Sequence, residues 1–206
     1  MSRVGLPDTA TTPDVVADVP ARPLRADAAR NRQKVLDAAE EVFGEQGTEG
    51  SLEEIARRAG VGVGTLYRHF PTRVDLIEQV YRSSVGELCA AAPRLAATLP
   101  PGQALEAWLL SFVTYVGRKR GMAAALRGAL GDDASQVFAD VHARLESTGD
   151  ELLFAAQREG TIRTDVGTMD VLRAVSGVCS AAADDPDKTT RVLRLVLDGL
   201  RYGATG

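Results

Sequence analysis

The stretch GVGVGTLYRHF, residues 60–70, decides the fold that we predict for this chain. Three glycines fall within its first five residues, which is typical of a tight turn. The second half predicts a short helix with two unlike faces. Leu66 and Phe70 lie four residues apart and would face inward, which leaves the opposite face to polar residues. That polar face would consist of Thr65, Arg68 and His69.

A second short helix precedes this turn. In SLEEIARRAG, residues 51–60, Ser51 stands three residues before Glu54, the spacing of a capping box. Gly60 would end this helix and supply the positive φ that reverses the chain. Two short helices joined by a tight glycine-bearing turn form a helix-turn-helix, whose second helix can enter the major groove of DNA.

Helical patterns flank this motif on both sides. Residues from about 28 to 46 carry apolar side chains at three-and-four spacing, and Gly47 would cap that helix in the left-handed conformation. After Pro71, Thr72 and Asp75 have the spacing that caps a long fourth helix. Further on, apolar periodicity without β alternation predicts helices near residues 104–121, 122–131, 134–158, 169–183 and 188–200.

These patterns predict an all-α chain of about nine helices in three parts. Residues 1–25 contain four prolines and no periodicity, so we expect a flexible tail. Residues 26–80 would form the helix-turn-helix domain, and residues 81–206 a larger helical domain. A break between its last two helices is expected at residues 184–187, where Pro186 lies.

Composition limits the classes of protein that the chain can belong to. It has 206 residues, 45% of them hydrophobic, and a net charge of -4, so only a local basic cluster could attract DNA. Five basic residues against one acid lie between residues 22 and 34. We expect no transmembrane helix and no signal peptide, and therefore a cytoplasmic protein. Cys89 and Cys179 are expected to be core residues rather than a disulfide.

The run VLDAAEEVFGEQGTEGSLEEIARRAGVGVGTLYRHFPTRVDLIEQV, residues 35–80, resembles the DNA-binding domain of the TetR family of bacterial repressors. The resemblance implies that the chain binds double-stranded operator DNA as a homodimer and is released by a small-molecule effector. Gly62 and Arg73 depart from the residues usual in the family, a small polar residue and a lysine. The resemblance implies DNA contacts by Ser51, Val63, Gly64, Thr65, Tyr67, Arg68, His69 and Arg73.

Within that set, the resemblance assigns phosphate contacts to Ser51 and Tyr67, and contacts with the phosphate backbone beyond them to His69 and Arg73. Residues 63–65 would approach base edges, and Arg68 would reach a guanine or a phosphate. Two alternatives stay open: Tyr67 could be a core aromatic with its hydroxyl at the rim, and His69 could brace the next helix. His69 as a metal ligand is disfavoured because the chain has only two histidines, and no metal site is predicted.

The C-terminal run AWLLSFVTYVGRKRGMAAALRGAL, residues 107–130, resembles the SbtR-like group of these regulators. The resemblance implies a ligand-binding domain that dimerises through its last two helices. Candidate cavity residues are Trp108, Phe112, Tyr115, Phe138 and His142, although helical spacing also suits three of them, Trp108, Phe112 and Phe138, as plain core. Candidate dimer contacts are Val175, Gly177, Val178, Leu193 and Val196, unless they face the chain's own core.

Two functional classes remain after this reading. The first is a ligand-responsive DNA-binding repressor that needs no cofactor. The second is a helical protein that no longer reads DNA, either a binding module or an enzyme. No residues with the spacing of a catalytic triad or a phosphate-binding glycine loop are evident, and the polar face with Thr65, Tyr67 and His69 favours the first class.

Overall fold

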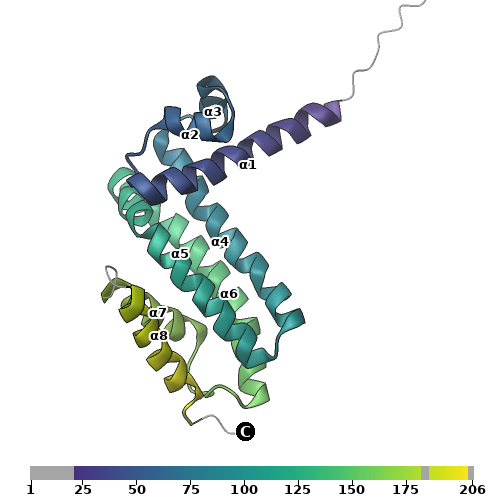
Figure 1. Ribbon diagram of the computed structural model, residues 1–206, viewed down its shortest axis with the longest axis vertical. Coiled ribbons are helices and arrows are strands. Elements are labelled where there is room, and N and C mark those ends of the chain that lie inside the picture. The colour runs from purple at the N-terminus through teal and green to yellow at the C-terminus, as the bar shows by residue number, and fades with distance from the viewer. Residues whose placement is uncertain (1–20, 182–185, 204–206) are drawn as a thin grey trace, which may run out of the picture.

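The structure is a computed structural model that describes residues 21–181 and 186–203, and in these ranges it consists of helices without strands (Figure 1). The eight α-helices described are α1 (Ala21–Gln46), α2 (Leu52–Ala59), α3 (Val63–His69), α4 (Arg73–Thr98), α5 (Pro101–Leu130), α6 (Ala134–Glu159), α7 (Thr168–Ala181) and α8 (Pro186–Arg201). A 3₁₀ turn, Gly131–Asp133, joins α5 to α6. The predicted all-α class is confirmed.

The structure has one helix fewer than the nine expected, because α5 is continuous. The sequence placed a helix end at Gly121, but α5 runs through it for 30 residues. Met122 and Leu126, just beyond this glycine, are buried, so the apolar side of the helix continues without interruption. A helix packed along its length tolerates an internal glycine, whose cost is about 1 kcal/mol.

The N-terminal helix begins earlier than expected. The tail was expected to reach residue 25, but α1 begins at Ala21, and residues 1–20 lie outside the described ranges. Pro23 falls in the first turn, where its missing N–H costs no helical hydrogen bond. Of the break expected at residues 184–187, the first part also lies outside the described ranges, and α8 begins at Pro186.

The helices form two packed groups that share α4. Helices α1, α2 and α3 pack together at one end, and α4 leaves this group to run beside α5 and α6 (Figure 1). Helices α7 and α8 pair with each other, and α7 packs on α5 and α6. One continuous apolar core links the two groups, from Val35 and Phe70 at one end to Trp108 and Leu153 at the other. A displacement of helices in one group can therefore be transmitted to the other group through the packed side chains.

Candidate DNA-binding surface and ligand cavity

The turn between α2 and α3 has the geometry that its glycine predicts. Gly60 has a φ of 66°, in the left-handed region that glycine adopts without strain. Its N–H donates to the carbonyl of Arg57 at 3.2 Å, and the N–H of Val61 donates to that of Ala56 at 3.0 Å. Gly62 follows as the N-cap residue of α3, with no side-chain hydrogen bond. These backbone bonds close α2 and fix where α3 starts.

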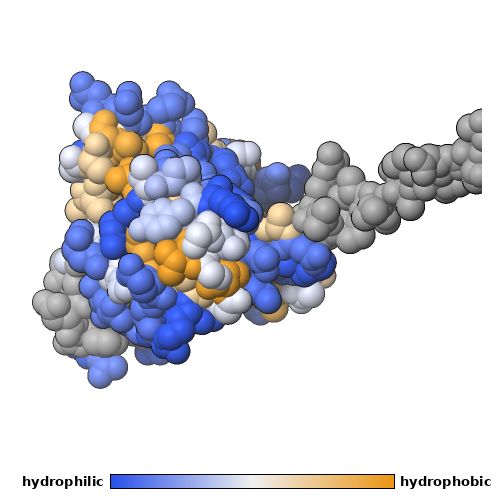
Figure 2. Space-filling view, turned by 90° about the horizontal axis from the view of Figure 1, so that it is seen from above, coloured by the Kyte–Doolittle hydropathy of each residue, from blue (hydrophilic) through white to orange (hydrophobic). Residues whose placement is uncertain are grey.

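Helix α3 presents one buried and one open side. Leu66 and Phe70 are each 1% exposed and pack in the core, as predicted. The opposite side leaves Tyr67 45% exposed, and a Cβ built on Gly64 would meet nothing within 4 Å. Thr65 and His69, which were predicted to lie on the polar face, are half-buried and lie at its edges. Seen from above, this end of the molecule is mostly hydrophilic, with smaller apolar patches between the polar residues (Figure 2). The outward-facing residues of α3 are Gly64, Tyr67 and Arg68.

Ser51 begins α2, and its hydroxyl has two contacts within the chain. The hydroxyl accepts the N–H of Glu54 at 3.2 Å and donates to Oε2 of Glu53 at 2.8 Å. The capping box is therefore only half formed here, since the Glu54 carboxylate binds arginines instead. At α4, by contrast, Thr72 and Asp75 form both bonds of the box. The role of Ser51 as a phosphate contact stays a prediction.

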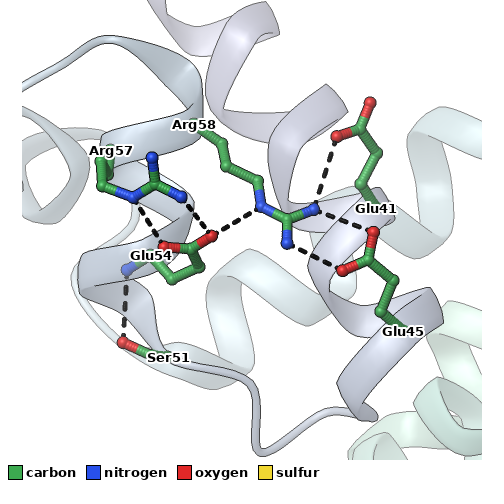
Figure 3. A network of polar contacts seen from close by, with 6 residues as sticks. All are labelled: Glu41, Glu45, Ser51, Glu54, Arg57 and Arg58. Atoms are coloured by element: carbon green, nitrogen blue, oxygen red, sulfur yellow. Dashed lines mark hydrogen bonds and ion pairs between the residues drawn. The ribbon is translucent and has the colours of Figure 1, made fainter.

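A polar network joins α2 to α1 on the solvent side (Figure 3). Arg58 donates to both carboxylate oxygens of Glu45, at 2.9 and 2.8 Å, and to Oε1 of Glu54 at 2.8 Å. Arg57 binds the same Glu54 carboxylate at 2.8 and 2.6 Å, and Glu41 lies 3.8 Å from Arg58. Arg58 is thus paired with carboxylates of its own chain and is a poor candidate for a DNA contact.

Arg57 and Arg58 lower the pKa values of the carboxylates to which they donate hydrogen bonds. Hydrogen bonds from Arg57 and then Arg58 lower the pKa of Glu54 to about 2. A hydrogen bond from Arg58 likewise lowers the pKa of Glu45. The carboxylates therefore stay charged throughout the neutral range, and the orientation of α2 on α1 is held by permanent charges.

Arg73 supports the loop between α1 and α2. Its Nη1 donates to the carbonyl oxygens of Thr48 at 2.8 Å and Gly50 at 2.6 Å. Gly50 itself is closely packed, because a Cβ built there would lie 2.6 Å from the Val42 side chain. The structure thus gives Arg73 a structural role that the sequence did not suggest, and its phosphate contact stays a prediction.

Arg32 on α1 is a residue near this surface that the sequence analysis did not single out. Its guanidinium lies 5.3 Å from the centre of the Phe70 ring, and Nη2 donates to Gln79 Oε1 at 2.5 Å. It therefore spans α1, the end of α3 and α4. The sequence signal was only a basic cluster on one helix, since the partners lie 38 and 47 residues away.

A cavity of about 430 Å³ lies among α4, α5, α6 and α7. Three of the five predicted residues, Phe112, Tyr115 and His142, line it. Burial raises the pKa of Tyr115, whose hydroxyl has no hydrogen-bond partner among the described residues. The remaining lining residues are Tyr81, Val116, Lys119, Ala123, Arg127, Val141, Leu145, Met169, Leu172, Arg173, Ser176 and Ser180.

The other two predicted cavity residues do not line this cavity, so that part of the prediction is corrected. Trp108 is fully buried, and its Nε1 donates to the carbonyl of Leu88 at 3.1 Å. Phe138 packs edge-on against Tyr81, at 5.6 Å between ring centres, and lies under Arg127. Trp108 points into the packed interior, whereas Phe138 is half-buried and packs against the core beside the cavity residue Tyr81.

Lys119 is the cavity residue that sequence reasoning missed. Its side chain is 4% exposed, and Nζ lies 3.2 Å from Oε1 of Glu40 on α1. The same carboxylate oxygen is 3.8 Å from Arg118 and accepts the Ser84 hydroxyl at 3.1 Å. Burial lowers the pKa of Lys119 against the opposing pull of Glu40. This ion pair connects the cavity wall to the helix that supports α2 and α3.

The exposed faces of α7 and α8 differ from the predicted dimer contacts. Val175 and Leu193 are 0% and 2% exposed, so they pack within this chain and cannot reach a partner. Gly177 is exposed, and a Cβ there would meet nothing within 4 Å. Val178 and Val196 are half-buried, and Leu195 is 69% exposed. Val175 and Leu193 lie on the sides of α7 and α8 that face the chain's own core, whereas Gly177 and Leu195 lie on the outer sides.

Other types of site are not evident in the residues that the structure describes. Within residues 21–181 and 186–203, no three His, Cys, Asp or Glu side chains gather in a way that could hold a metal ion. None of the described helices combines the length and apolarity that crossing a membrane requires. Cys89 is half-buried and Cys179 is buried, and the two do not form a disulfide.

Two family profiles match the chain and together span most of it. Residues 35–80 match the profile described as bacterial regulatory proteins, tetR family. Residues 100–202 match the profile described as transcriptional regulator SbtR-like, C-terminal domain. An HTH-type transcriptional regulator of Staphylococcus aureus (strain USA300) is 46% identical over 54 residues, which are 26% of this chain and 29% of that protein. The curated relatives are therefore matched over less than a third of their length.

Two solved structures are similar over nearly their whole length. A TetR transcriptional regulator from Streptomyces coelicolor is 45% identical, with a TM-score of 0.74 over 84% of this chain and 99% of that one. A TetR transcription regulatory protein from Mycobacterium vanbaalenii is 38% identical, with a TM-score of 0.70 over 87% of this chain and 100% of that one.

Proposed function

The chain belongs to the TetR family of bacterial regulatory proteins, and on this premise we propose that it is a repressor that binds a palindromic operator as a homodimer and leaves it when a small molecule binds. It is thus a transcriptional regulator rather than an enzyme. The observation that carries the repressor proposal is the exposed side of α3. Tyr67 and Arg68 are exposed there next to glycines, while the opposite side of the helix is buried in the core. We propose a cytoplasmic location because the operator lies there.

The shape of this surface suits a groove of DNA. Gly62 and Gly64 are exposed and leave open space where Cβ atoms would stand, so the first turn of α3 can come close to the duplex. Arg68 would reach a base edge or a phosphate, and the Tyr67 hydroxyl a phosphate oxygen. Ser51, Val63, Thr65, His69 and Arg73 surround this approach and complete the proposed contact set.

The homodimer would form through the exposed sides of α7 and α8. Gly177 would allow a partner helix to approach closely, and the apolar Leu195, 69% exposed in the single chain, would be covered. Two copies related by a two-fold axis would place two α3 helices on successive turns of one face of DNA, about 34 Å apart or somewhat more. That arrangement requires a palindromic operator.

The test is binding to DNA from the region upstream of the chain's own gene. We expect a Kd below about 1 µM for a fragment that contains the operator, with affinity that falls steeply as salt rises. An unrelated fragment of equal length is the control, and it should bind at least about a thousandfold more weakly. Equal binding to both fragments, or none, would favour the second class, a helical binding protein that does not read DNA.

A further inference from the structure

The cavity has a positively charged wall. Lys119, Arg127 and Arg173 line it, and among its lining residues within the described part of the chain there is no Asp or Glu. The rest of the wall is aromatic and aliphatic, with Phe112, Val116 and Leu172 among its members. A charge in such a partly enclosed site is screened less than in water, so an anion gains more from these cations than it would at the surface.

One polar group in the wall lacks a partner. Tyr115 is 9% exposed, and its hydroxyl forms no hydrogen bond of normal geometry among the described residues, although the Tyr81 hydroxyl lies close enough to contribute to its raised pKa. A buried hydroxyl without a partner destabilises a fold by about 1–3 kcal/mol. Burial also raises the pKa of Tyr115, so the hydroxyl keeps its proton and can donate it to an acceptor. An acceptor atom on a ligand would remove this deficit.

Tyr115 and Lys119 stand four residues apart on α5, so they lie on the same side of the helix. Lys119 is already paired with Glu40, which approaches from α1 at 3.2 Å. The Lys119 ammonium therefore contacts the Glu40 carboxylate and also lines the cavity, where an anionic ligand could contact it. Arg118, the neighbouring cation within 3.8 Å of Glu40, does not line the cavity.

We propose that this cavity binds a small carboxylic acid with an apolar body, whose carboxylate accepts the Tyr115 hydroxyl and competes with Glu40 for Lys119. The inference rests on the proposed function, because it names the class of effector for that repressor. The apolar body lies against Phe112 and Val116, and the acid group is the part that acts on the protein.

Competition for Lys119 supplies a route from the cavity to DNA. Glu40 belongs to α1, which packs against α2 and α3, so weakening the Glu40–Lys119 pair loosens the support of the recognition helix on α5. Coupling of this kind changes operator affinity by roughly 5- to 150-fold. By reciprocity, operator DNA weakens binding of the acid by the same factor.

Octanoate, decanoate and hydrocinnamate, each with its primary amide, are suitable probes of the binding step. Trp108 is the only tryptophan and stacks on Phe112 with 6.3 Å between ring centres, so its fluorescence reports occupation of the cavity. We expect at least one acid to bind with a Kd below about 1 mM and at least about tenfold more tightly than its amide. Lys119→Met should abolish this preference. No binding by any of the three acids, or equal binding by the amides, overturns the proposal.

Arg118→Met is the matched control, since it removes a cation near Glu40 without changing the cavity wall. It should keep the preference for acid over amide. If Arg118→Met loses the preference as fully as Lys119→Met, general charge attraction rather than a cavity contact explains it, and the proposal fails. A fold check by circular dichroism on both variants separates loss of binding from loss of structure. If Lys119→Met does not fold, Tyr115→Phe replaces it and should reduce the preference at least about threefold, the equivalent of about 0.7 kcal/mol for one hydrogen bond.

Glu40→Gln tests the coupling step. Without the competing carboxylate, this variant should bind the acid at least as tightly as the wild type, while the acid should no longer release DNA. Retention of the full release would overturn the competition for Lys119. Operator binding without any ligand is measured in parallel: if it holds while no acid binds, only the inference fails, and if it is absent, the proposed function itself fails.

Discussion

The α2–α3 end of the molecule and the α5–α7 cavity use charge in opposite ways. Around α2, arginines and acids satisfy one another, as Arg58 does with Glu45 and Glu54, and the network holds a surface in place. Around the cavity, the lining cations Lys119 and Arg173 pair with acids that lie outside the lining, Glu40 and Asp170, and the buried Tyr115 hydroxyl forms no hydrogen bond of normal geometry. The first region is satisfied by its own side chains, whereas the second leaves the Tyr115 hydroxyl without a well-formed hydrogen bond. This difference is the reason why we propose the ligand site at the cavity and not beside α2.

The largest effect should come from removing the core of the helix-turn-helix. Phe70→Ala deletes a ring that is 1% exposed, so we expect the free energy of unfolding to fall by about 3–5 kcal/mol. Urea unfolding followed by circular dichroism measures it. Phe154→Ala, at a phenylalanine that is 53% exposed, is the control and should change stability by less than about 0.5 kcal/mol. Equal effects would mean that α3 is not packed on α1 and α2 as described.

A smaller effect is expected at the proposed dimer surface. Gly177→Leu adds a side chain where the two copies would approach closely, which should weaken dimerisation by about 1–3 kcal/mol. Sedimentation velocity at several concentrations measures the shift towards monomers. Gly128→Leu, at another exposed glycine with open space around it on α5, is the control and should leave the dimer intact. A Gly177→Leu dimer as tight as the wild type would move the interface away from α7.

At the DNA surface, the loss of one hydroxyl should have a modest effect. Tyr67→Phe keeps the exposed ring but removes its hydrogen bond, so operator affinity should fall by about 1 kcal/mol, roughly fivefold. Fluorescence anisotropy with labelled operator measures it. The matched control is Tyr202→Phe, at a tyrosine beyond α8 that is exposed and far along the chain. If both variants bind like the wild type, the open side of α3 does not hold phosphate through Tyr67.

The smallest effect should be the pH dependence of the α1–α2 network. Since its arginines lower the pKa of Glu54 from 4.5 to about 2, the folded state prefers the charged carboxylate. The stabilisation is therefore fully present above pH 4.5 and is lost as the pH falls towards 2. Glu54→Gln should lower the melting temperature at neutral pH, and its difference from the wild type should shrink between about pH 5 and about pH 3. A difference that stays constant over that range would show that charge is not what Glu54 contributes; Glu49→Gln, in the exposed α1–α2 loop, is the control.

Much of the α2–α3 region could be predicted because its signals act over a few residues. A Cβ atom disfavours positive φ, so the chain uses glycine where it needs this conformation, as at Gly47 and Gly60. Thr72 and Asp75 lie within one turn of each other and form the capping box of α4. The four-residue spacing of Leu66 and Phe70 predicts which side of α3 is buried, and both residues are indeed buried in the core. Which of the outward residues touch DNA stays a prediction, since that depends on a partner molecule.

The sequence by itself determined the all-α fold, the helix-turn-helix and the approximate place of each helix, because these depend on local sterics and on the period of apolar residues. Only the tertiary structure decided the rotation of each helix. It placed Trp108, Val175 and Leu193 in the core rather than at a cavity or an interface. It also paired Lys119 with Glu40, which lies 79 residues earlier in the chain. Apolar spacing shows that a helix has a buried side, but which neighbour covers each residue depends on packing between distant segments, and no local pattern encodes it.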